Sequence, residues 1–170
     1  MRNIEIKVRV PSLDEIRRSA VTLGARPIET YADTDAYFHV PHGRFKLRST
    51  AGKSSATLIS YERPNELHSR ISTYRLIRVD DGAAMRAMLE QALGVLVEIK
   101  KRREFLLFGA TRIHLDQVDR LGDYVELETV LGEIPECDAR IEHEHVARGL
   151  HLERYELVPV SYSDLLLSAE

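Results

Sequence analysis

The chain has 170 residues, of which 44% are hydrophobic and 30% are charged, a balance typical of one folded domain with a substantial core. The formal net charge of −3 excludes an overall cationic field that would attract nucleic acid or an anionic membrane, although the 24 lysines and arginines could cluster locally. Cys137 is the only cysteine, so no disulfide can form within the chain. No apolar run approaches the roughly 20 residues that span a bilayer, and no signal-peptide pattern opens the sequence. We therefore expect residues 1–170 to form a single cytoplasmic domain.

The first segment, residues 2–10, predicts a strand because polar and apolar residues alternate along it. Asn3, Glu5, Lys7 and Arg9 would share one face of this strand, and apolar side chains would share the other.

The rest of the chain is expected to form strands joined mostly by hairpin-length turns, with a few helices between and after them. The predicted strands are residues 26–31, 35–40, 44–50, 56–63, 70–79, 95–107, 111–118 and 123–131. The predicted helices run from the N-cap Ser12 to Gly24, over 82–93, over 139–149 and, capped by Ser161, over 163–169. Residues 151–158 have no clear assignment. So many strands with short connections predict a mainly β, antiparallel sheet, and closure into a barrel would remove its edges.

Charged side chains recur at period two on several of these strands. The sets are Arg44/Lys46/Arg48, Lys101/Arg103, Arg112/His114/Asp116 and Glu126/Glu128. A solvated face with cross-strand Glu–Lys pairs would explain any one of them. The acids and bases are segregated, however, and on inward faces they would suit a divalent metal held by carboxylates and a polyphosphate held by cations.

Seven ordered blocks of the sequence resemble the CYTH domains, or triphosphate tunnel metalloenzymes, and the late blocks look most like the class IV adenylate cyclase-like branch. The blocks are Asn3–Lys7 (N-I-E-I-K), Asp33–Phe38, Gly43–Arg48, Tyr61–Pro64, Ser72–Tyr74, Val97–Arg103, and Arg112–Asp116 with Gly122–Glu128.

The resemblance implies a closed eight-stranded antiparallel barrel with a hydrophilic tunnel and a few flanking helices. By matching position, Glu5, Glu126 and Glu128 would hold Mg²⁺ or Mn²⁺. Asp116 would orient a cation or a second metal, and Glu5, Lys7 and Asp116 form the expected catalytic set. The implied triphosphate ligands are Lys7, Lys46, Arg48, Arg63, Arg70, Lys101 and Arg103.

Asn3 stands where the family usually has its first glutamate. An amide oxygen can coordinate a hard cation but carries less charge, so one strongly held ion is expected rather than two. The resemblance leaves three functions open: an adenylate cyclase, an inorganic or thiamine triphosphatase, and a polyphosphate-binding module without catalysis. The expected partner is a small triphosphate such as ATP, tripolyphosphate or thiamine triphosphate, bound by a monomer or a homodimer.

The histidines have simpler interpretations than metal ligation. His143 and His145 lie two apart in a predicted helix and point in different directions, so both are expected at the surface. His114 shares a face with Asp116, which favours a hydrogen-bonded structural histidine over a general base.

Overall fold

A computed structural model describes residues 2–62, 69–132 and 134–169 of the chain. Its strands are β1 (Arg2–Val10), β2 (Arg26–Phe38), β3 (Arg44–Thr50), β4 (Ala56–Glu62), β5 (Arg70–Val79), β6 (Val95–Phe108), β7 (Thr111–Val118), β8 (Gly122–Leu131) and β9 (Glu156–Leu157). Its helices are α1 (Leu13–Leu23), α2 (Gly82–Leu93), α3 (Glu136–Gly149), the 3₁₀ turn η1 (Leu152–Arg154) and α4 (Tyr162–Ala169). In the described ranges, no helix combines the length and the apolar character needed to cross a bilayer.

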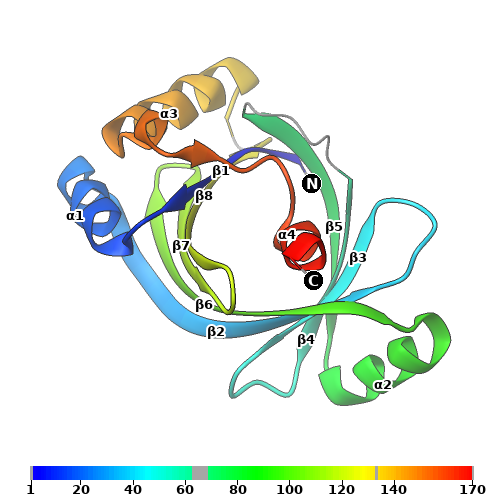
Figure 1. Ribbon diagram of the computed structural model, residues 1–170. Coiled ribbons are helices and arrows are strands. Elements are labelled where there is room, and N and C mark those ends of the chain that lie inside the picture. Colours follow the sequence, from blue (N-terminus) through cyan, green and yellow to red (C-terminus); the bar gives the residue numbers. More distant parts are fainter. Residues whose placement is uncertain (1, 63–68, 133, 170) are drawn as a thin grey trace.

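Eight strands close into an antiparallel barrel, which confirms the expected fold (Figure 1). The order around the barrel is β5-β4-β3-β2-β6-β7-β8-β1, and pairing of β1 with β5 completes the ring. The short strand β9 adds to β1 beyond the point where β5 ends. Because each of the eight strands has a paired neighbour on both sides, none of them is an edge strand of an open sheet.

Residues 26–40, expected as two short strands, contain the single strand β2. Hydrogen bonding to β6 continues along nearly its whole length, with register irregularities only between Pro27 and Glu29 and between Tyr37 and Phe38. Asp33, which lies between the two expected strands, pairs with Thr50 of β3 and Lys101 of β6, and its carboxylate accepts a hydrogen bond from the Thr50 hydroxyl at 2.7 Å. Continuous pairing with a long neighbour has overridden the local turn preference.

Two of the three apolar core clusters lie outside the barrel, between its wall and the helices. Val8, Leu127 and Ile113 point outward from β1, β8 and β7 and are fully buried against α1 and α3. On the other side, α2 covers the outer faces of β2 and β3, including Phe38 and Leu47. Since the apolar side chains point outward, period-two alternation sends the polar ones into the barrel.

The C-terminal helix α4 lies across one end of the barrel, inside the ring of strands in Figure 1. Its Tyr162 and Leu166 pack with Tyr37, Ile99 and Tyr124 in a buried cluster at that end. Ser161 caps the helix as expected, because its hydroxyl accepts from the Asp164 amide at 3.1 Å while the Asp164 carboxylate accepts from the Ser161 amide at 3.0 Å.

Candidate functional site

A cavity of about 540 Å³ occupies the barrel interior, and we call it the tunnel cavity. Nine of the residues expected at the site line it, and they come from four strands. They are Asn3, Glu5, Lys7, Lys46, Arg48, Lys101, Arg103, Glu126 and Glu128. The solvated-face interpretation is therefore wrong for these strands.

Strand register places the acids of β8 across the barrel from the cations of β3. Glu5 of β1 lies directly opposite Glu128 of β8, and Lys7 lies opposite Glu126. Strand β8 is four strands from β3 in either direction around the ring. The acids of β8 therefore face Lys46 and Arg48 of β3 across the barrel.

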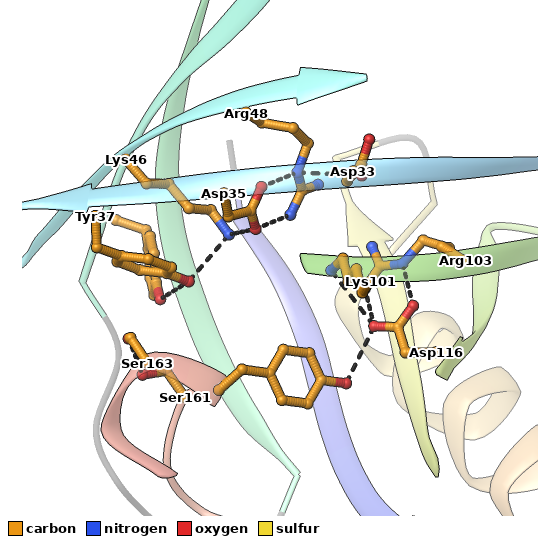
Figure 2. Close-up of polar contacts among 12 residues, drawn as sticks. Asp33, Asp35, Tyr37, Lys46, Arg48, Lys101, Arg103, Asp116, Ser161 and Ser163 are labelled. Carbon is orange, nitrogen blue, oxygen red and sulfur yellow. Dashed lines mark hydrogen bonds and ion pairs between the residues drawn. The ribbon is translucent and has the colours of Figure 1, made fainter. Parts of the chain in front are cut away.

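One buried carboxylate holds Lys46 and Arg48, the two cations of β3 that line the tunnel cavity (Figure 2). Asp35 accepts from Lys46 Nζ at 2.7 Å and from Arg48 Nε and Nη2 at 2.7 Å each. Burial disfavours the ionised form, but the charges of Arg48 and Lys46 outweigh it and hold the pKa of Asp35 well below its usual range. Lys46 also donates to the Tyr37 hydroxyl at 3.1 Å. These contacts fix two cationic groups at the tunnel wall before any ligand is present.

A second buried carboxylate, Asp116 of β7, holds Lys101 and Arg103, the two cations of β6 that line the tunnel cavity (Figure 2). Arg103 donates to both of its oxygens, with Nε–Oδ1 at 2.6 Å, and Lys101 Nζ lies 3.4 Å from Oδ2. The Tyr162 hydroxyl of α4 donates to Oδ2 at 3.0 Å. Burial opposes ionisation, but Arg103 and Lys101 lower the pKa of Asp116 to about 2. Asp116 is fully buried behind these groups. This position suits a residue that orients the cations rather than one that contacts a substrate.

The environment of Lys101 weakens its positive charge. Burial and the neighbouring charge of Arg103 lower the pKa of Lys101 from 10.5 to about 8, although Asp116 partly offsets them. An additional negative group in the tunnel cavity would favour its protonated form further.

Glu126 joins the cationic and acidic parts of the tunnel. It accepts from Arg103 Nη2 at 2.6 Å and lies 3.2 Å from Lys7 Nζ. Burial disfavours its charge, but Lys7 and Arg103 hold the pKa of Glu126 well below its usual range. Lys7 also donates to the Val160 carbonyl at 3.1 Å and lies 3.9 Å from the centre of the Tyr162 ring, so the segment leading into α4 helps to position it.

Ligand atoms of His114, Glu126 and Glu128 lie within 4.8 Å of one another, and Glu5 lines the same cavity opposite Glu128. Burial raises the pKa of Glu128, and the charges of Glu126 and Glu5 add to this effect. The Asn3 amide oxygen and His114 Nδ1 are buried there without a hydrogen-bond partner among the described residues. Repelling carboxylates beside two unsatisfied polar atoms fit a divalent cation, for which Glu5, Glu126, Glu128 and Asn3 offer oxygen ligands.

Two of the expected triphosphate ligands, Arg63 and the side chain of Arg70, lie outside the described residues. Arg44 is drawn to α4, where its Nη2 lies 2.7 Å from the Asp164 carboxylate. The expected surface position of His143 is wrong, because this side chain is buried and its ring contacts the Thr129 hydroxyl at 2.9 Å. His145 is exposed, as expected.

Asp35 and Tyr162 are two site residues that the sequence patterns did not indicate. Asp35 continues the period-two alternation of Asp33 and Tyr37, so its inward orientation could have been found once residues 26–38 were taken as one strand. The sequence carries no comparable signal for Tyr162, because its contact with Asp116 joins residues 46 positions apart and depends on how α4 packs.

Comparison with known proteins agrees with this architecture. The CYTH domain family model matches residues 1–162. The PH1012 protein of Pyrococcus horikoshii is similar in structure, with a TM-score of 0.84 and 23% identity over 96% of this chain and 98% of that chain. No curated protein matches the sequence.

Two further solved structures show the same fold. A candidate adenylate cyclase from Vibrio parahaemolyticus has a TM-score of 0.72 and 18% identity, over 96% of this chain and 97% of that chain. A candidate adenylyl cyclase from Hippeastrum, described as having a dominant triphosphatase activity, has a TM-score of 0.65 and 14% identity, over 99% and 96% of the two chains. Identities this low show a shared fold alone, whereas the family match covers nearly the whole sequence. The chain belongs to the CYTH domain family.

Proposed function

We propose that this protein is a metal-dependent enzyme that acts on a small triphosphate in the tunnel cavity, most like a class IV adenylate cyclase that converts ATP to cyclic AMP and pyrophosphate. One observation carries the proposal: six cationic side chains line a cavity that also contains the carboxylates of Glu5, Glu126 and Glu128. The six are Lys7, Lys46, Arg48, Lys101, Arg103 and Arg112.

The energetics of these charges support a polyanionic ligand. Lys7, Lys101 and Arg103 are each at most 5% exposed, and burying charges costs free energy that even well-formed ion pairs often fail to recover. Apolar side chains could fill a barrel of this size more stably. The charges are therefore better explained by a bound group that they neutralise.

Different residues of the tunnel cavity would bind the triphosphate and stabilise the reacting phosphate. Lys46, Arg48, Lys101 and Arg103 would hold phosphate oxygens, with Asp35 and Asp116 keeping these cations in place. Lys7 lies next to Glu126, between the cations and the acids, and would stabilise charge that develops on the reacting phosphate. A divalent ion held by Glu5, Glu126 and Glu128 would supply Lewis-acid polarisation of the phosphoryl oxygens.

In the cyclase reaction, the ribose 3′-oxygen forms a bond to the α-phosphorus while the bond from that phosphorus to the α–β bridging oxygen breaks. Pyrophosphate leaves with the bonding electron pair, and the hydroxyl proton is released to water. The tunnel cations would neutralise the charge that moves onto pyrophosphate.

Triphosphate hydrolysis is the second candidate, because the same cations and carboxylates serve a water attack on the terminal phosphorus. The Hippeastrum protein of the same fold is described as having a dominant triphosphatase activity, which supports hydrolysis as a candidate reaction. Asn3 motivates a third candidate, a binding module without turnover, because it removes one carboxylate from the expected metal ligands.

Product analysis separates the three. The protein is incubated with Mn²⁺ or Mg²⁺ and, in turn, ATP, tripolyphosphate and thiamine triphosphate, and cyclic AMP, pyrophosphate and orthophosphate are quantified. Cyclic AMP with equimolar pyrophosphate from ATP supports the cyclase. Orthophosphate without cyclic AMP supports hydrolysis, and with tripolyphosphate as the substrate an equimolar amount of pyrophosphate accompanies it. Tight tripolyphosphate binding without products supports the binding module, and absence of binding and of products contradicts all three.

A further inference from the structure

His114 occupies an unusual position in the tunnel wall. It lies on β7 directly opposite Glu126 of β8, and its side chain lines the tunnel cavity. The residue is 5% exposed, and its Nδ1 lies 3.7 Å from Glu128 Oε1, beyond hydrogen-bonding distance. The nitrogen is thus close to a carboxylate without bonding to it.

Neither a structural hydrogen bond nor packing alone explains the position of this histidine. A structural histidine would satisfy its buried ring nitrogen, but Nδ1 has no hydrogen-bond partner among the residues that the structure describes. Packing accounts for part of the ring, which meets Phe105 edge-on with 5.5 Å between ring centres. Packing does not account for a polar atom left unsatisfied beside two glutamates.

A metal ion would satisfy all of these groups together. Ligand atoms of His114, Glu126 and Glu128 already lie within 4.8 Å of one another. Ligands bound to one ion at about 2.1 Å are roughly 3 to 4 Å apart, so small side-chain movements would complete the set. Asn3 contributes only a neutral oxygen nearby, and a nitrogen ligand would strengthen a site that has one carboxylate fewer.

We propose that His114 Nδ1 is a direct ligand of the tunnel metal, and that this nitrogen makes the site favour divalent transition metals over Mg²⁺. Imidazole binds borderline ions well, whereas Mg²⁺ prefers an all-oxygen environment. The inference rests on the proposed metal-dependent function and adds to it the kind of metal that the site selects.

Electron paramagnetic resonance of bound Mn²⁺ tests the ligand directly. Pulsed spectra of the protein with Mn²⁺, with and without tripolyphosphate, are expected to show the nitrogen coupling of a directly bound imidazole. Tripolyphosphate contains no nitrogen, and His114 is the only histidine among the described residues that line the cavity. The coupling should disappear in His114→Gln and persist in His145→Gln, whose histidine is exposed on α3.

Binding titrations test the metal preference. His114→Gln should weaken Co²⁺ and Mn²⁺ binding by about 10-fold or more and change Mg²⁺ binding less. The ratio of Co²⁺ or Mn²⁺ affinity to Mg²⁺ affinity should therefore be smaller in the variant than in the wild type. If His114→Gln does not fold, wild-type protein labelled with ¹⁵N-histidine replaces it, and the coupling must then change to that of ¹⁵N.

The outcomes separate this inference from the function on which it rests. Bound Mn²⁺ without the coupling of a direct nitrogen ligand would overturn the role of His114 and leave the triphosphate function standing. Failure to bind Mn²⁺ both with and without tripolyphosphate would overturn both.

Discussion

Glu5 and Glu128 are direct cross-strand neighbours on β1 and β8, and both side chains line the tunnel cavity. Like charges directly opposite each other destabilise a sheet. Burial raises the pKa of Glu128, and the charge of Glu5 is one of the groups that add to the shift. The metal-free tunnel therefore carries a repulsion that a divalent cation would relieve.

Glu128→Gln should accordingly have opposite effects on metal-free and metal-bound protein. Removing one charge is expected to raise the free energy of unfolding without metal by about 0.5 kcal/mol. The same change should abolish most of the stabilisation that Mn²⁺ gives to the wild type. Thermal unfolding with and without Mn²⁺ measures both effects. The matched control is Glu144→Gln, an exposed glutamate on α3. An equal Mn²⁺ shift in Glu128→Gln and wild type would count against the metal role of Glu128.

Adjacent lysines on β6 provide a paired test of triphosphate binding. Lys101 is buried in the tunnel wall, whereas the Lys100 side chain is 62% exposed on the outer face. Because a charge-assisted hydrogen bond contributes about 1.5–3 kcal/mol, Lys101→Ala should weaken tripolyphosphate binding by about 10-fold or more. Calorimetric titration of both variants measures the difference, and Lys100→Ala should bind like the wild type. Comparable affinities for the two variants would remove Lys101 from the site.

Asp35→Asn tests whether a ligand can replace an internal carboxylate. The change leaves Lys46 and Arg48 without their shared buried acid, and breaking a buried ion pair typically costs about 3–5 kcal/mol. Tripolyphosphate should recover part of this loss, so it should raise the unfolding temperature of Asp35→Asn more than that of the wild type. A smaller increase in the variant would show that these two cations do not reach the ligand.

Asn3→Glu asks whether the family's missing carboxylate limits metal binding. The Asn3 amide oxygen is buried without a hydrogen-bond partner among the described residues, beside the acids of β1 and β8. A carboxylate there should tighten Mn²⁺ binding by about 10-fold or more. Asn3→Gln, which keeps the amide, is the control. Unchanged Mn²⁺ affinity in Asn3→Glu would place residue 3 away from the metal.

His143 should make stability depend on pH between about 4 and 6.5. Burial lowers the pKa of His143 from 6.5 to about 4, so the folded protein keeps this ring neutral where the unfolded chain protonates it. The unfolded state then binds more protons, and stability falls as pH decreases through this window, by up to about 3 kcal/mol. Denaturant unfolding at several pH values should show a shallower dependence in His143→Gln than in His145→Gln. The same slope in both variants would contradict this assignment.

The sequence predicted the barrel wall well because alternation on a strand directly reflects which way each side chain points. Glu5, Lys7, Lys46, Arg48, Lys101 and Arg103 all follow this rule, and all line the tunnel cavity. Burial of His143 could not be read from α3 alone, since it depends on the rotation of the helix against β8. The contact of Tyr162 with Asp116 likewise depends on the tertiary position of α4.

Tripolyphosphate binding to the wild-type protein in the presence of Mn²⁺ tests the central claim most directly. Calorimetric titration should show saturable binding of one tripolyphosphate per chain, weakened strongly by Lys101→Ala and little by Lys100→Ala. No saturable binding, or binding that both lysine variants retain unchanged, would contradict a triphosphate site in the tunnel cavity.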